Sequence, residues 1–314
     1  MDSSRCVVIE GQHRLARVHI GIPTYNGSKR TKWLLQSLER AGGLPSQDVA
    51  ITVLNDGSSR AGELEALHGL SKHYGLNLLN HPKNRGVTQS WNDIVNFVNC
   101  EFMVLLNDDV MLTPRWLDRL VYFLENNACG GASPNLFFHT EEDVADLLAG
   151  RPVTPRDPHT KVPNPNYPGY PLNDHVAEHD YPRVTISSSG SGFGFRRSVY
   201  LAVGGFDERF HNSHTEIDFG TSMAKIDLPS FMLTDRIWHL WSASFRENRE
   251  LHCNGDAERF HAKWGPGHEH NKFMLGLRGI KGETPTPRGL QTVKWLDVND
   301  QPREGPLNAP GVKT

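Results

Sequence analysis

The sequence lacks any long hydrophobic run. Hydrophobic residues make up 37% of its 314 residues, and the longest apolar stretch falls well short of the roughly 18 to 20 residues that cross a bilayer. The N-terminal segment MDSSRCVVIEGQHR has only CVVI as an apolar core, which is too short for a signal peptide. We therefore expect no transmembrane segment and a cytoplasmic location.

Cysteine is also scarce, and neither sign of charge dominates. The 4 cysteines, Cys6, Cys100, Cys129 and Cys253, are scattered without CxxC spacing, which favours reduced, buried thiols. A formal net charge of −3 gives no overall basic field for nucleic acid or an anionic membrane. Charged residues at 22% are typical of a soluble globular protein.

Strand-like and helix-like segments alternate through the first 135 residues. Strands are predicted at 16–23, 49–56, 76–82 and 101–108, and helices at 29–43, 61–75, 87–99 and 113–126. Thr113 is the expected N-cap of the last helix, with Pro114 as its first residue. This order predicts an α/β, Rossmann-like fold with a mostly parallel central sheet and helices on both faces.

The alternation stops between about 139 and 184. Residues 151–175 are dense in proline and lack periodicity. We interpret 139–184 as an insertion that covers the site or meets an acceptor, although a surface loop without such a task is an equal alternative. After residue 282 prolines and glycines again occur without periodicity. The prediction is one domain over 1–282, followed by an extended tail over 283–314.

Polar residues follow each predicted strand of the first half. Ligands of parallel sheets bind beyond the carboxyl ends of the strands, where these residues lie. The segment FMVLLNDDVML places Asp108 and Asp109 directly after a buried run. Acids buried there are costly unless they are paired or bind a cation, and carboxylates suit Mg2+ or Mn2+. Acids are equally common as helix caps or turn residues, so the pair alone leaves both interpretations open.

Motifs that follow one another along the chain narrow the choice. They are IPTYNG (22–27), VLNDGSS (53–59), NRGVTQSWN (84–92), LLNDDV (105–110), GSGFGFRRSVYLAVGGFDERF (190–210), TEIDFG (215–220), WHLWSASF (238–245) and FHAKWG (260–265). In this order and spacing the set resembles the family-two glycosyltransferases, enzymes with the GT-A nucleotide-diphospho-sugar fold. The resemblance covers roughly residues 16 to 265.

The resemblance implies a donor-binding pocket at the strand ends. The positions it implicates are Pro23, Thr24, Tyr25, Asp56, Arg85, Gly86, Asp108 and Gly192. Asp56 matches the acid that contacts the base, typically uracil, although it is also a plausible turn residue. Asp108 is expected at the ribose or a metal-bound water. Gly192 lets the backbone, with the neighbouring Phe193 ring, meet the donor sugar and acceptor.

The resemblance also implies a metal and a base. Asp109 and His239 are the expected ligands of Mn2+ or Mg2+, although Asn107 departs from a strict DxD motif and His239 also suits a packed core position. Glu216 is the expected general base, with Asp218 as its neighbour or second choice. Both acids are also ordinary first-turn helix residues.

These roles predict an inverting, metal-dependent glycosyltransferase with a nucleotide-diphosphate sugar, most often a UDP-sugar, as donor. The acceptor is open among a glycan, a protein, a lipid-linked sugar and a modified nucleic acid. Two alternatives remain: a metal-dependent nucleotidyltransferase or phosphohydrolase, and a catalytically silent nucleotide-sugar-binding module. The replacement of family acids by Asn107 and Thr215 favours the silent module.

Overall fold

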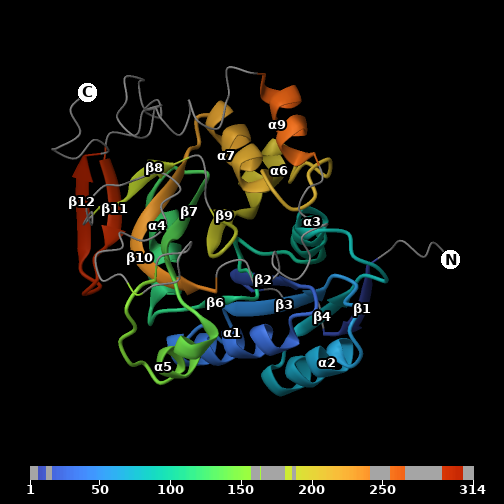
Figure 1. Cartoon of the computed structure of the whole chain (residues 1–314). Helices are drawn as coiled ribbons and strands as arrows, with labels where there is room; N and C mark the ends of the chain where they lie inside the picture. Colours follow the sequence, from blue (N-terminus) through green and yellow to red (C-terminus); the bar gives the residue numbers. More distant parts are fainter. Residues whose placement is uncertain are drawn as a thin grey trace.

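A computed structural model describes residues 6–11, 16–156, 163, 181–185, 189–240, 255–265 and 292–306. Its centre is a sheet with strand order β1-β4-β3-β2-β5-β9-β7-β10-β6, and β8 pairs with β10 (Figure 1). The strands are β1 (Val7–Glu10), β2 (Val18–Thr24), β3 (Val49–Asn55), β4 (Asn77–Asn80), β5 (Phe102–Leu105), β6 (Val110–Met111), β7 (Gly131–Phe138), β8 (Arg183–Thr185), β9 (Phe193–Arg196) and β10 (Ser230–His239).

Four neighbouring strands, β4, β3, β2 and β5, run parallel. Thr24 pairs in register with Asn55, and Asn55 pairs with Asn80, so the carboxyl ends of β2, β3 and β4 lie level. β9 is inserted antiparallel between β5 and β7, whereas β7 and β10 are again parallel. The predicted α/β class with a largely parallel sheet is confirmed, and the loops that end β2, β3, β4 and β5 share one edge.

Helices cover both faces of this sheet (Figure 1). The helices are α1 (Ser28–Ala41), α2 (Glu63–Tyr74), α3 (Val87–Phe97), α4 (Trp116–Asn126), α5 (Val144–Leu148), α6 (Arg197–Val203), α7 (Thr215–Lys225) and α9 (Asp256–Trp264). Helices α1, α2 and α4 pack into one apolar core, and α3, α6 and α7 into another. β5 supplies Phe102 and Val104 to the first core and Met103 and Leu105 to the second, because successive side chains point to opposite faces.

The C-terminal region differs from the expected extended tail. It contains a hairpin of β11 (Thr292–Leu296) and β12 (Pro302–Pro306), which packs on α4. Val293 is 1% exposed in the first core, and the Asn127 amide donates to the Lys294 carbonyl at 2.8 Å. Val293 and Trp295 alternate with polar residues, which is a short strand pattern that the surrounding prolines and glycines obscure.

The structure corrects one further expectation and adds elements that the sequence did not reveal. Helix α4 begins at Trp116, so Thr113 is not its cap; the Thr113 hydroxyl instead donates to the Arg236 carbonyl at 2.8 Å. The described part of the predicted insertion holds a 3-10 turn (Glu141–Asp143) and α5, which contacts α1. Most of the proline-dense stretch lies outside the described residues. β1, which sequence patterns did not reveal, pairs antiparallel with β4.

Candidate active site

The loops after β2 and β3 are joined by Asn26. Its side-chain oxygen accepts the backbone N–H groups of Ser59 and Arg60 at 3.0 Å each, and its backbone lies in the left-handed region (φ 50°). The Tyr25 hydroxyl lies 3.2 Å from the Ser59 hydroxyl. Pro23 and Thr24 are buried, whereas Tyr25 is partly exposed. Of the expected nucleotide-contacting residues in this loop, Tyr25 therefore has the accessible side chain.

Asp108 is held in a buried ion pair. Its Oδ2 accepts the Thr24 hydroxyl at 2.5 Å, and Arg30 Nε donates to Oδ1 at 3.2 Å. A Cβ on Gly27 would lie 1.9 Å from Oδ2, so only glycine leaves room for the carboxylate. Burial raises the pKa of Asp108, and Asp109 adds to that effect, although Arg30 opposes it. These contacts make Asp108 a link between two loops, and its expected ribose contact stays a prediction.

Sequence reasoning missed Arg30. The residue is 7% exposed and belongs to α1, whose buried face includes Leu34 and Leu38. Arg30 lies four residues before Leu34, on the same face of the helix. A cation at the end of an apolar stripe was the available signal, because a buried guanidinium requires an acidic partner.

The structure brings Asp109 and His239 together. Asp109 Oδ1 and His239 Nε2 are 3.1 Å apart, with side-chain exposures of 8% and 11%. The strands place them: His239 ends β10 and pairs with Val110 of β6, directly after Asp109. Burial by itself raises the pKa of Asp109, but the nearby His239 and Arg30 outweigh it, and the pKa is lowered. The carboxylate is therefore ionised at neutral pH beside an imidazole.

A second histidine, His139, lies next to this pair and was not singled out from the sequence. It directly follows β7, and its backbone N–H donates to the His239 carbonyl at 3.3 Å. Burial lowers the pKa of His139 to about 4, so the ring is neutral. Its Nδ1 faces the Thr140 carbonyl at 2.9 Å. Its position after the buried strand GASPNLFF was the available signal.

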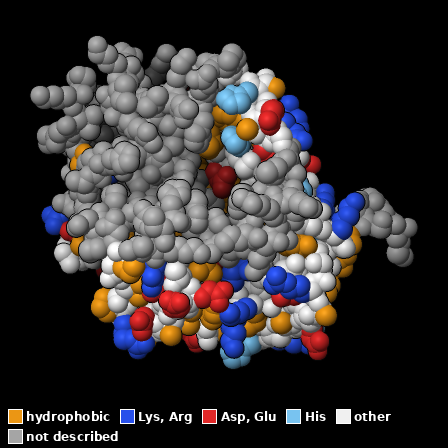
Figure 2. Space-filling model, viewed as in Figure 1, with side chains coloured by type: hydrophobic (Ala, Val, Ile, Leu, Met, Phe, Trp, Pro, Cys, Tyr) orange, Lys and Arg blue, Asp and Glu red, His pale blue; other side chains and the backbone are white. Residues whose placement is uncertain are grey.

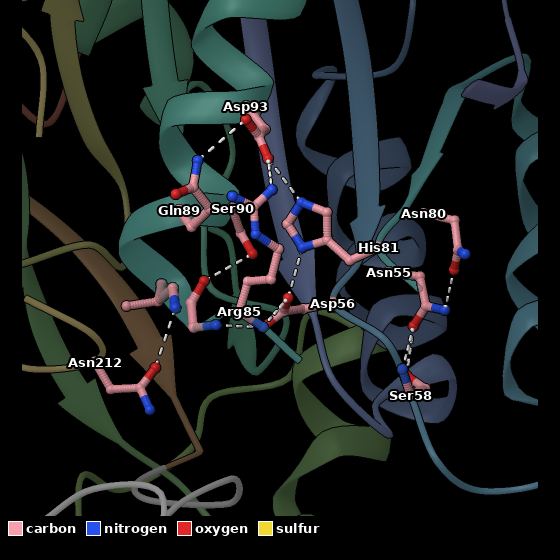
Figure 3. Close-up of polar contacts among 12 residues, drawn as sticks. Asn55, Asp56, Ser58, Asn80, His81, Arg85, Gln89, Ser90, Asp93 and Asn212 are labelled. Atoms are coloured by element: carbon pink, nitrogen blue, oxygen red, sulfur yellow. Dashed lines mark hydrogen bonds and ion pairs between the residues drawn. The ribbon is translucent and has the colours of Figure 1, made fainter. Parts of the chain in front are cut away.

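Asp56 is the centre of a polar network (Figure 3). The backbone N–H groups of Arg85 and Gly86 donate to its Oδ1 and Oδ2, each at 2.9 Å. The ring of His81 lies between Asp56, at 2.6 Å from Nδ1, and Asp93, at 2.8 Å from Nε2. The network fixes the turn that begins α3, and it brings the predicted Asp56, Arg85 and Gly86 together. His81 itself was missed, since a histidine in the turn LNHPKN carries no distinctive signal.

Cys6 also lies beside this network. Cys6, His81 and Asp93 offer ligand atoms within 4.8 Å of one another, the only such group among the residues the structure describes. Both His81 nitrogens face carboxylates, and Arg85 Nη1 lies 3.1 Å from Asp93 Oδ2. A guanidinium at that oxygen disfavours a cation there, so we interpret the group as an ion-pair network.

The two acids of α7 have different surroundings. Glu216 Oε1 accepts the Gly190 backbone N–H at 3.4 Å, and burial raises the pKa of this carboxyl group. Asp218 instead receives the Lys263 ammonium at 2.9 Å and the Trp264 indole N–H at 2.7 Å. Asp218 thus anchors α9, whereas Glu216 lies against the 190–191 segment. This difference favours Glu216 over Asp218 as the residue that takes a proton.

The 190–192 segment connects Glu216 to the acidic loop. Asn107 donates from its amide to the Ser191 hydroxyl at 2.9 Å. Gly192 has φ 108° and donates its N–H to the Leu105 carbonyl at 2.9 Å, so this donor is not directed at a ligand. Phe193 is fully buried against Phe219, because β9 is an interior strand covered on both faces. The expected contact of Phe193 with sugar or acceptor is therefore wrong.

In Figure 2 acidic and basic side chains alternate over α1 and α2, and an acidic side chain lies recessed in the middle of the view. Among the described residues no helix combines the length and apolar character needed to cross a membrane.

Comparisons with known proteins agree with this architecture. Residues 19–203 match the family model for glycosyl transferase family 2. The chain is 26% identical over 143 residues to the O-antigen biosynthesis protein RfbC of Myxococcus xanthus, a match that covers 45% of this chain and 11% of that protein. The aligned region thus spans about a tenth of the curated relative.

Solved structures share the fold at low identity. The mannosyltransferase PcManGT from Pyrobaculum calidifontis, in complex with GDP-Man and Mn2+, aligns with a TM-score of 0.51 and 17% identity over 71% of this chain and 56% of that one. GalNAc-T7 with UDP, GalNAc and Mn2+ aligns with a TM-score of 0.54 and 12% identity over 73% of this chain and 45% of that one. Residues 1–349 of TarS from S. aureus align with a TM-score of 0.51 and 14% identity over 84% of this chain and 79% of that one.

Proposed function

Because this chain belongs to glycosyl transferase family 2 and is a glycosyltransferase, we propose that it moves a sugar from a UDP-sugar to an acceptor hydroxyl, with inversion at the anomeric carbon. The observation that carries the proposal is the Asp109–His239 pair at the ligand-binding edge of the sheet. The loops of Tyr25 and Asp56 end strands at the same edge of the sheet, where parallel sheets bind their ligands, and this supports a nucleotide site there.

The residues at this edge fit a divalent cation. Adjacent ligands of an octahedral ion at about 2.1 Å are about 3 Å apart. The 3.1 Å separation of Asp109 Oδ1 from His239 Nε2 matches that value, and an oxygen with an imidazole nitrogen suits Mn2+. When bound, Mn2+ or Mg2+ supplies positive charge to the diphosphate leaving group. Asp109 and His239 would hold the ion. Arg30 forms an ion pair with the neighbouring Asp108 and so offsets its negative charge.

Glu216 serves as the general base for the acceptor hydroxyl. Its raised pKa and its place beside Gly190 suit a carboxylate that accepts a proton as the hydroxyl attacks the anomeric carbon. A single displacement of this kind inverts the configuration. Asp218 supports the site indirectly by anchoring α9.

The donor base faces Asp56, and the Tyr25 ring and the Ser59 hydroxyl lie at the open rim of the same loops. The acceptor is a glycan, a protein, a lipid-linked sugar or a modified nucleic acid. UDP-containing and GDP-containing complexes both occur among the structural neighbours, so the fold alone leaves the base open.

A thermal-shift panel of nucleotides and UDP-sugars with and without Mn2+ tests the proposal, because a ligand of the native state raises the unfolding temperature. We expect a Mn2+-dependent shift for UDP and UDP-sugars that disappears in Asp109→Ala. Asp118→Ala is the matched control, since Asp118 is an exposed acid on α4. Absence of a shift with every nucleotide contradicts the proposal and favours the metal-hydrolase alternative. Tight UDP binding without UDP release from any sugar donor favours the silent module.

A further inference from the structure

The carboxylate of Asp56 has few acceptor sites left for a ligand. An ionised carboxylate offers about four lone-pair sites, two on each oxygen. The His81 ring at 2.6 Å and the Arg85 N–H at 2.9 Å occupy Oδ1, and the Gly86 N–H at 2.9 Å occupies one site of Oδ2. A single acceptor site therefore remains, on Oδ2, and the side chain is 6% exposed.

The Nδ1 atom of His81, which faces Asp56, keeps its proton at neutral pH. The His81 side chain has no exposed surface, and its Nε2 lies 2.8 Å from Asp93 Oδ2. Burial by itself lowers the pKa of His81, but the hydrogen bonds to Asp56 and Asp93 outweigh it and raise the pKa to about 10. Both ring nitrogens thus carry hydrogen at neutral pH. Figure 3 shows the His81 ring lying between Asp56 and Asp93. Vacating Oδ1 would leave a buried donor unpaired.

We propose that His81 limits Asp56 to one base N–H and thereby selects uracil against guanine. Uracil presents a single ring N–H, which fits the one site on Oδ2. Guanine presents its ring N–H and an amino N–H side by side, which together require both oxygens of a carboxylate. With Oδ1 already filled, one guanine donor meets the donors of His81 and Arg85. The inference rests on the proposed function, in which Asp56 faces the donor base.

The first test compares UDP and GDP binding to the wild-type chain by titration calorimetry with Mn2+ present. One unmade hydrogen bond to a charged group corresponds to roughly a tenfold to hundredfold loss of affinity. We expect UDP to bind at least tenfold tighter than GDP. Equal affinities overturn the role of His81 but leave the proposed function intact. Absence of binding for both nucleotides overturns the proposed function as well, so the two failures are distinguishable.

Two variants of His81 separate the contact of Nδ1 with Asp56 from the contact of Nε2 with Asp93. In His81→Asn the amide nitrogen takes the place of Nδ1 and keeps a donor on Asp56. In His81→Gln the amide nitrogen takes the place of Nε2 and keeps a donor on Asp93. The acceptor site of Asp56 Oδ1 that faced His81 is then free for a base. Both remove the charge, so they are matched controls for each other. The ratio of UDP to GDP affinity should fall at least tenfold in His81→Gln relative to His81→Asn; equal ratios refute the proposal. Thermal unfolding checks that both variants fold. If either fails to fold, equal affinities of the wild-type chain for UDP and GDP still overturn the proposal.

Discussion

Replacing Arg30 by methionine should destabilise the fold sharply. Arg30 and Asp108 have side-chain exposures of 7% and 6%, so the ion pair is shielded from water. Removing one partner of such a pair leaves a buried charge unpaired, at a cost of about 3–5 kcal/mol. The Thr24 hydroxyl still donates to Asp108 at 2.5 Å, but one neutral donor does not replace a guanidinium. The expected fall in Tm is roughly 5 to 8 °C for a chain of this length.

The control is Arg151→Met, which removes the same group from an exposed pair. Arg151 and Asp146 have side-chain exposures of 60% and 48%, where loss of an ion pair costs less than about 1 kcal/mol. Urea unfolding of both variants measures the difference. Adding Asp108→Asn to Arg30→Met should recover part of the loss, because the uncompensated carboxylate is gone. If Arg30→Met costs no more than Arg151→Met, the buried pair does not carry the role we assign to it.

Three further predictions concern chemistry, pH and the hairpin. Glu216→Gln should lower kcat by about 10²–10⁴ without weakening UDP binding, whereas Asp218→Asn should act mainly on stability; equal losses of kcat in folded variants contradict the assignment. His81 has a folded-state pKa of about 10, above its unfolded value near 6.5, so its stabilising contribution is complete below about pH 6.5 and is lost as pH rises toward 10. Urea unfolding across this range should show that the free energy of unfolding of the wild-type chain falls by at most about 1.4 kcal/mol per pH unit, and that this fall is absent in His81→Gln. Identical pH slopes in the two proteins argue against the ion pairs of His81. Val293→Ala should lower the free energy of unfolding by about 1–3 kcal/mol, whereas Val298→Ala, at a position 70% exposed, should leave it nearly unchanged. A negligible effect of both substitutions would show that Val293 does not contribute to the core.

The sequence predicted the parallel half of the fold because its signals are local. Buried strands alternate with amphipathic helices there, and the predicted 87–99 helix corresponds to α3 at Val87–Phe97. The hairpin was missed because its strands are short and one begins at Pro302, within a region rich in proline. Thr113 was expected to cap α4, but a contact with Arg236 on distant β10 takes its hydroxyl. Such contacts depend on tertiary structure, which local patterns do not encode.

Motif order located the site, but the partners of each residue required the structure. Asp109 and His239 were expected together from the resemblance, and the pairing of β10 with β6 brings them within 3.1 Å. Asp108 was expected at the ribose or a metal-bound water, which stays a prediction, and its ion pair with Arg30 of α1 became visible only in the structure. The role of His81 depends on which oxygens of Asp56 are occupied, and a sequence carries no record of that.

The most direct test of the account is the dependence of UDP affinity on Mn2+, measured by titration calorimetry. In the wild-type chain and in Asp118→Asn, Mn2+ should tighten UDP binding at least about tenfold, the equivalent of roughly 1.4 kcal/mol. In Asp109→Asn this gain should be lost, because the carboxylate that holds the ion is gone. Equal UDP affinity with and without Mn2+ in the wild type, or a gain that survives in Asp109→Asn, would contradict the central claim.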